Sequence, residues 1–413
     1  MVGLLRERVK MLLKNRTFRI ILVSDLLQQL AIWIRNMALL FFIMDQTKGD
    51  PAAVSLLSLL EYAPIFIFSI VGGLFADRWN PKRTMIAGDI LSAASIGIII
   101  VLVANDGWQA IYAAVFVSAV LSQFSQPSSA KVFKEHIPEE HVPGAIGITQ
   151  SLSSLFLILG PIAGTGIYQW AGLTASLAVL PALFLLSALI LSFLPRSETV
   201  NNEEKTTLRE DLSEGIRFIR SDKSLLRLFA AFSMIGLAAG LVNPLEIFIV
   251  TERLGLSQEK LQWFAAADGA GLLIGALVAA GFTGLLKVRY LFPVAIIFLS
   301  LTFVVEALSV WPLLTGAFRF LNGIMLAIVN TAVGSYVITK IPQTMVGRVN
   351  GIVTPLFMGA LLIGTSVSGM WSSVAGVIPV YLGAAVICMI SVLPSLKIHL
   401  HRDHPAEEKS AHA

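Results

Sequence analysis

Apolar runs long enough to cross a lipid bilayer recur along almost the whole chain, and they restrict its fold more than any other feature. A helical span needs roughly 20 apolar residues, and a helix satisfies its own backbone hydrogen bonds in lipid. We predict about twelve such spans. They cover residues 17–43, 53–76, 84–104, 109–130, 145–170 and 172–194, and then 224–250, 260–286, 290–310, 312–339, 351–374 and 377–398.

The composition agrees with a membrane protein. Only 14% of the residues are charged and 56% are hydrophobic, whereas a soluble protein carries about 25% charged residues. No small-residue cleavage site follows the first apolar run, so we expect that run to stay as an anchor. We predict an all-α integral membrane fold of twelve transmembrane helices in two pseudo-symmetric six-helix bundles. Its parts are a basic N-terminus (1–16), a first bundle (17–195), a linker (196–223), a second bundle (224–398) and a tail (399–413).

The linker is the longest polar stretch of the chain. Leu212, Ile216 and Ile219 fall on one face of a helix there, and charged residues fall elsewhere. Such a helix lies on a membrane surface or links the bundles as a solvated helix, and the pattern leaves both readings open.

Basic residues predict the orientation, because they concentrate in cytoplasmic loops. With the N-terminus inside, the outer loops hold only Lys48, Arg253 and Lys260. The remaining basic residues outside the spans then fall on the cytoplasmic side in both halves. Both termini are therefore expected in the cytoplasm, and the plasma (inner) membrane of a bacterium is the expected location.

Several function classes are disfavoured. The basic residues sit at helix ends and form no separate domain, so we expect no nucleic-acid partner. Cys388 is the one cysteine, which excludes an internal disulfide and a cysteine metal cluster. The sequence has no Ser/His/Asp triad, phosphate loop, His-Glu-x-x-His motif or redox cysteine pair, which argues against an enzyme and an ATP-driven pump. We expect no metal and no cofactor.

The two halves resemble each other. The stretch IPEEHVPGAIGI from Ile137 matches IPQTMVGRVNGI from Ile341 in register, and Gly160 then falls on Gly364. A parallel repeat of six helices places a transport site at the interface between the halves.

The loop between the second and third predicted spans carries Gly73, Asp77, Arg78, Lys82 and Arg83 in the stretch GLFADRWNPKR. This stretch resembles the loop signature of the major facilitator superfamily, Gly-x-x-x-Asp-Arg-x-Gly-Arg-Lys/Arg-Lys/Arg. Asn80 stands in place of the glycine, and Pro81 stands in place of one basic residue. The resemblance implies a charge latch that holds the outward-open state, braced by Asp89 in the next helix. The alternative is that the basic residues only enforce topology.

A second stretch is similar to the fifth-helix motif of facilitator exporters, which the family associates with antiport. Its residues here are Gly160, Pro161, Gly164 and Gly166. An ordinary glycine and proline packing seam is the alternative reading.

The fourth-helix motif of the family normally carries an arginine, and Ser118 stands at that position. The tenth span instead carries Arg319 and Gly323 in the same pattern. The run Trp33-Ile-Arg35-Asn-Met-Ala is similar to the macrolide-efflux branch of drug–proton antiporters.

Apart from basic residues within four positions of a span end, eight charged residues fall inside the predicted spans, where charge is costly and usually functional. They are Asp25, Arg35, Glu61, Asp89, Glu246, Asp268, Glu306 and Arg319. At about 1.5 Å rise per residue, Arg35 and Glu61 lie level in one half, as do Asp268 and Arg319 in the other. Family architecture places helices 3 and 9 away from the cavity, and Glu246 and Glu306 are expected to reach lipid headgroups.

We expect Glu61 or Asp268 to carry a coupling proton, with Arg35 and Arg319 nearby and Asp25 as a weaker candidate. The alternative is a static ion pair that holds helix register. The favoured function is proton-driven export of a hydrophobic or amphiphilic small molecule by a monomer in a lipid bilayer. A siderophore or lysophospholipid exporter is the second reading, and a membrane enzyme or scaffold the third.

Overall fold

The structure is a computed structural model that describes residues 11–76, 79–105, 107–123, 125–195, 208–282 and 288–396. Within these ranges every regular element is helical. The first half contains α2 (Arg16–Gln46), α3 (Pro51–Ala76), α4 (Pro81–Ala104), α5 (Ala110–Ser122), α6 (Ser125–His136) and α7 (Val142–Ser192). The linker contains α8 (Leu208–Ser221). The second half contains α9 (Lys223–Val242), α10 (Glu246–Phe248), α11 (Leu261–Phe282), α12 (Val288–Leu308), α13 (Pro312–Lys340), α14 (Gln343–Ala375) and α15 (Val377–Leu396).

The number of crossings agrees with the prediction of twelve. Ten segments of the described residues are long and apolar enough to span a membrane, and α5 is a shorter apolar helix. The longest segment holds two crossings, because α7 leaves helical geometry at Gly172, where φ is 71°. Tyr168 before this point lies beside Asp45 at the end of α2, whereas Ser187 after it lies beside Ser24 near the start of α2. The chain therefore reverses at Gly172, and α5 with α6 supplies the remaining crossing.

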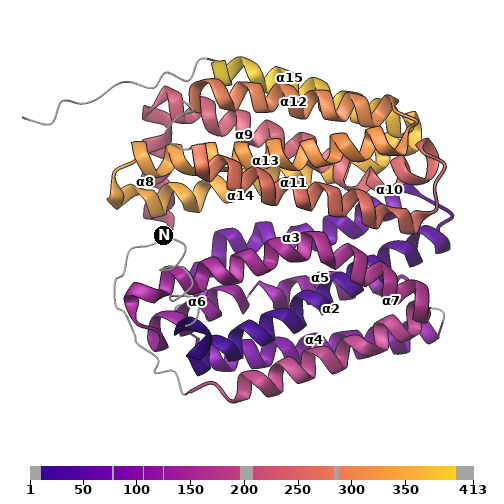
Figure 1. The fold of residues 1–413 in the computed structure, drawn as a ribbon, viewed down its shortest axis with the longest axis vertical. Coiled ribbons are helices and arrows are strands. Elements are labelled where there is room, and N and C mark those ends of the chain that lie inside the picture. Colours follow the sequence, from indigo (N-terminus) through magenta and orange to yellow (C-terminus); the bar gives the residue numbers. More distant parts are fainter. Residues whose placement is uncertain are drawn as a thin grey trace, which may run out of the picture.

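The helices form two groups that follow the two halves of the sequence (Figure 1). In the first half, α2 and α7 pack together, and an added Cβ on Gly160 would lie 2.3 Å from Trp33 Cγ. In the second half, α9 and α14 pack together, and an added Cβ on Gly364 would lie 2.3 Å from the Leu237 carbonyl oxygen. The glycines that the sequence repeat aligns thus permit the corresponding close helix contact in each half, which agrees with pseudo-symmetry.

The linker helix α8 packs against α14 and α9 of the second half. Glu214 forms an ion pair with Arg348 at 3.0 Å (Oε2 to Nη1). An added Cβ on Gly215 would lie 2.6 Å from Ile352 Cδ1, and Ile219 is buried. The expected amphipathic helix is present, but part of its apolar face docks on protein, because the ends of α9 and α14 offer apolar surface there.

The two halves meet through α3 with α14 and through α7 with α11. We call the side where α2 ends and α3 begins the outer side, after the orientation that the basic residues predict. Near this side Gln258 Nε2 donates to Asp45 Oδ1 at 3.1 Å. An added Cβ on Gly369 of α14 would lie 2.8 Å from Ser55 Oγ of α3. The halves are therefore closely joined at the outer side.

Candidate functional site

A cavity of about 430 Å³ lies in the first half and reaches from mid-membrane depth toward the inner side. Its described lining comes from α2 to α7 and is rich in amide, hydroxyl and carboxyl groups. The lining residues used below are Asp25, Gln28, Gln29, Arg35, Glu61, Asp89, Ser92, Phe133 and Ile146. Phe133 near the end of α6 and Ile146 near the start of α7 mark the inner limit. The cavity has the size of a small-molecule site.

Arg35 is the centre of a polar network at the deep end of this cavity. The residue is 3% exposed, and its guanidinium donates to the Ser118 hydroxyl of α5. Arg35 Nη2 also donates to Asn36 Oδ1 at 2.9 Å, and Asn36 Nδ2 donates to Glu61 Oε1 at 2.6 Å. Arg35 Nη2 lies 3.9 Å from Glu61 Oε1. The structure thus brings Arg35 and Glu61 together, as their matched depth predicts, and Asn36 bridges them.

A second network lies closer to the inner side. Gln28 Nε2 donates to Asp89 Oδ1 at 2.8 Å, which joins α2 to α4. The hydroxyls of Ser24 and Ser187 lie 2.7 Å apart beside it. Asp89 therefore stands in the cavity wall with Asp25, although family architecture placed its helix away from the cavity. Asp89 is 2% exposed and bonds to α2, so no described contact shows it bracing the signature loop.

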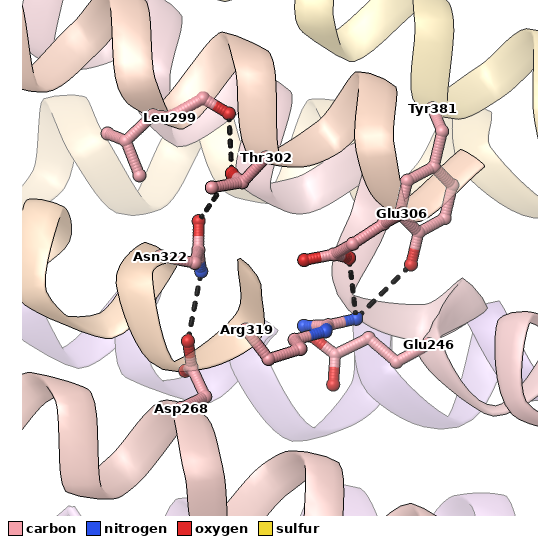
Figure 2. A network of polar contacts seen from close by, with 8 residues as sticks. All are labelled: Glu246, Asp268, Leu299, Thr302, Glu306, Arg319, Asn322 and Tyr381. Atoms are coloured by element: carbon pink, nitrogen blue, oxygen red, sulfur yellow. Dashed lines mark hydrogen bonds and ion pairs between the residues drawn. The ribbon is translucent and has the colours of Figure 1, made fainter. Parts of the chain in front are cut away.

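The second half holds a buried cluster around Arg319 (Figure 2). Arg319 Nη1 lies 2.6 Å from Glu246 Oε1, and Arg319 Nη2 lies 3.1 Å from Glu306 Oε2. The same nitrogen donates to the Tyr381 hydroxyl at 3.3 Å. Three other helices, α10, α12 and α15, therefore supply partners to the Arg319 guanidinium of α13. These partners compensate the free-energy cost of burying its charge.

Asp268 has a different partner. Asn322 Nδ2 donates to Asp268 Oδ1 at 3.0 Å, and Thr302 Oγ1 lies 3.3 Å from Asn322 Oδ1 (Figure 2). An added Cβ on Gly323 would lie 2.0 Å from the Asp268 carbonyl oxygen, so this glycine allows α11 and α13 to approach. The level pair expected in the second half is thus not an ion pair. Asp268 is instead hydrogen-bonded to Asn322, which lies about one helical turn from Arg319 on α13.

The expectation that Glu246 and Glu306 reach headgroups is wrong. Glu306 is 0% exposed, and both acids are ion-paired with Arg319. Position near a span end predicted headgroup contact, but a buried arginine at the same depth attracts both acids instead. Asn36 and Tyr381 were also missed. Asn36 directly follows Arg35, and this adjacency was the one sequence feature that could have marked it as part of the site. Tyr381 lies in an ordinary apolar run and had no such feature.

The signature loop is only partly described. Gly73 lies in α3, while Asp77 and Arg78 lie outside the described residues. Asn80 caps the start of α4, because its side chain accepts a hydrogen bond from the Arg83 backbone N–H at 3.1 Å. Lys82 Nζ donates to the Ser192 carbonyl at 2.7 Å and to that of Leu194. Lys82 therefore binds the C-terminal end of α7 in its own half, where the helix dipole stabilises a positive charge.

The residues of the antiport-like motif divide into two kinds. An added Cβ on Gly164 would lie 2.6 Å from the Trp33 carbonyl oxygen, so Gly164 joins Gly160 in the tight contact with α2. Pro161 lies inside α7 between them. An added Cβ on Gly166 would meet no described atom within 4 Å. Gly160 and Gly164 are therefore required by packing, and Gly166 is not.

Comparison with known proteins agrees with this architecture. The sequence model described as "Major Facilitator Superfamily" matches residues 21–250 and 228–413. The chain is 26% identical over 395 residues to the uncharacterized MFS-type transporter YkuC of Bacillus subtilis, covering 91% of each chain. It is 26% identical over 379 residues to macrolide efflux protein A of Streptococcus pyogenes, covering 88% of this chain and 91% of that protein.

The nucleoside transporter NupG has the same fold. Its crystal structure matches with a TM-score of 0.75 at 12% identity, covering 92% of this chain and 98% of that one. At this identity the likeness concerns the fold alone. The family match spans nearly the whole chain, and ten of the described helical segments are long and apolar enough to cross a membrane. The chain therefore belongs to the major facilitator superfamily and is a multi-pass membrane transporter, not an enzyme.

Proposed function

We propose that this transporter exports amphiphilic small molecules in exchange for protons. The observation that carries the proposal is Glu61 in the wall of the cavity, hydrogen-bonded to Asn36 and 3.9 Å from Arg35. The similarity to an efflux protein supports the direction of transport. A monomer in a bacterial inner membrane, with both termini in the cytoplasm, is part of the proposal.

Glu61 suits proton exchange because it is accessible from the cavity and held by partners that a substrate can displace. Its side chain is 29% exposed and lines the cavity, so water and substrate reach it. Asn36 donates to its carboxyl group, and the guanidinium of the buried Arg35 lies 3.9 Å away. A substrate that displaces Asn36 or shifts Arg35 removes these partners, and the proposal places proton exchange at that step.

Asp268 is the second candidate. It comes from the helix that corresponds to α3 in the repeat, and Asn322 holds its carboxyl group. The positive charge of Arg319 is already matched by Glu246 and Glu306. Protonation of Asp268 therefore leaves the Arg319 cluster intact, so this carboxyl group is able to change charge during the cycle.

We infer that the structure corresponds to a state open toward the inner side. The halves are joined near the outer side through Asp45 with Gln258 and through Ser55 with Gly369. The cavity extends the other way, toward the ends of α6 and α7. Opening of the outer contacts, with closure of the inner side, completes alternating access.

The test uses purified protein in liposomes with an imposed pH gradient and a panel of macrolides, lipophilic dyes, siderophores and lysophospholipids. Wild-type protein is expected to move at least one amphiphile against its concentration gradient only when protons flow the other way. Glu61→Gln and Asp268→Asn are expected to separate the candidates, because the variant that lacks the coupling acid loses gradient-driven transport but keeps substrate exchange.

Glu252→Gln is the matched control, because Glu252 is exposed near the outer end of the second half. Full gradient-driven activity in both Glu61→Gln and Asp268→Asn would contradict proton exchange at these acids. If only siderophores or lysophospholipids of the panel were transported, the substrate would belong to that second class and not to the drug-like amphiphiles.

A further inference from the structure

We propose that the cavity of the first half contains a subsite for a protonated amine, formed by the carboxyl groups of Asp25 and Asp89. The inference deepens the proposed function and rests on it, since the amine is taken to belong to the transported molecule. The subsite is separate from Glu61 and Asp268 and places the charged end of the substrate between α2 and α4.

Asp89 is the first observation. Its side chain is 2% exposed, and it lines the cavity. Oδ1 accepts from Gln28, and the Ser187 hydroxyl also lies close to the carboxyl group, but Oδ2 is buried and makes no hydrogen bond of regular geometry among the described residues. A buried acceptor without a donor costs free energy, and a buried carboxylate costs more. Such an oxygen beside an open cavity is explained by a ligand that brings the missing donor.

The second observation is the position of Asp25. It lines the same cavity from α2, about one helical turn from Gln28, whose side chain bonds to Asp89. Two neighbouring acids repel each other unless a cation lies between them or one holds a proton. An ammonium group between the two carboxyls satisfies both charges.

The described residues of the cavity wall provide no basic side chain that pairs with Asp25 and Asp89. The lining contains the acids Asp25, Glu61 and Asp89, and Arg35 is the basic residue among the described lining. Arg35 is already bonded to Asn36 and Ser118 and close to Glu61. It is also ten residues from Asp25 on one helix, or about 15 Å along the axis. The described lining therefore supplies no cation to the two acids at the inner end of the cavity, and a bound ammonium group fills that role in the proposal.

The neighbouring groups match an ammonium ion better than a larger planar cation. An ammonium group carries three donors on one small centre. Asp89 Oδ2 and the Asp25 carboxyl group offer two acceptors, and Ser92 on α4 offers a hydroxyl oxygen in the same wall. The rest of the cavity, about 430 Å³, takes the attached apolar body.

The experiment measures binding of two probes of similar shape to the full-length protein in detergent micelles. 2-Phenylethylammonium carries the charged group, and 2-phenylethanol replaces it with a neutral hydroxyl. Wild-type protein is expected to bind the ammonium probe more tightly than the alcohol. Equal affinity for the two probes in wild-type protein overturns the proposal, and that result needs no variant.

Asp25→Asn and Asp89→Asn are expected to weaken binding of the ammonium probe about tenfold or more, because a charge-assisted hydrogen bond is lost. Binding of 2-phenylethanol is expected to stay within about twofold of wild type, which also shows that each variant is folded. Glu252→Gln is the matched control for loss of an acid outside the cavity. Unchanged ammonium binding in Asp89→Asn overturns the proposal.

The outcome is independent of the transport test. If wild-type protein binds the ammonium probe as described but moves no substrate with a pH gradient, the proposed antiport fails and the subsite stands. If antiport is measured and both asparagine variants bind the amine normally, the subsite fails and the proposed function stands.

Discussion

The guanidinium of Arg35 on α2 donates a hydrogen bond to the hydroxyl of Ser118 on α5. Ser118 stands where the fourth-helix motif of the superfamily has an arginine. The first bundle therefore still has a guanidinium at this place, but it comes from the first span instead of the fourth.

This relationship predicts that the arginine is exchangeable between the two helices. Arg35→Ser is expected to abolish transport, because it leaves Glu61 without its positive neighbour. Arg35→Ser combined with Ser118→Arg is expected to restore a measurable part of it, since the charge returns to the same place from α5. Transport in liposomes measures the effect, and a double variant no more active than Arg35→Ser would contradict it.

The Arg319 cluster predicts a strong effect on stability. Glu306→Gln is expected to destabilise the second bundle by roughly 3 kcal/mol, because it removes one partner of a buried ion pair. Unfolding in detergent measures the change, with Glu252→Gln as an exposed-acid control expected to stay near wild type. Arg319→Gln combined with Glu306→Gln should cost less than the sum of the single changes. Additive costs would show that the two residues do not interact.

The glycines of α7 predict a contrast within one motif. Gly160→Ala and Gly164→Ala are expected to lower both transport and thermal stability, because the new methyl group meets Trp33 at 2.3 and 2.6 Å. Gly166→Ala meets no described atom within 4 Å and is the matched control. It is expected to be neutral or stabilising by up to about 1 kcal/mol, the gain of alanine over glycine in a helix. Equal effects at all three sites would refute the assigned contact.

The outer contact between Asp45 and Gln258 predicts a way to arrest the cycle. In a variant with Cys388→Ala, the changes Asp45→Cys and Gln258→Cys place two thiols where side chains now meet at 3.1 Å. Oxidation or a short thiol cross-linker is expected to stop transport, and reduction to restore it. Binding of 2-phenylethylammonium should persist in the cross-linked protein. Continued transport after complete cross-linking would show that these residues stay together throughout the cycle.

The positions of the spans were predictable because a helix in lipid must satisfy its own backbone hydrogen bonds over a set length. That requirement is local, so apolar runs alone place most helices close to their observed bounds. The reversal at Gly172 and the match of Gly160 with Gly364 were visible in the same way, as sequence spacing and internal repetition.

The partners of the buried charges were harder to predict. Arg319 was expected level with Asp268, yet it pairs with Glu246 and Glu306, and Asn322 binds Asp268. Depth along a helix follows from residue number, but the direction in which a side chain points depends on the rotation and tilt of its helix against its neighbours. Asp89 lines the cavity for the same reason, and Gln28 of α2 donates a hydrogen bond to it there.

The apolar runs of the chain thus determined the twelve spans, since each span is stable by itself in lipid, and the internal repeat indicated two related halves. Which acid meets which base, and which carboxyl group faces the cavity, was decided only when the helices packed. Close approach at a few glycines sets the rotation of each helix, and contacts between residues far apart in sequence depend on that rotation.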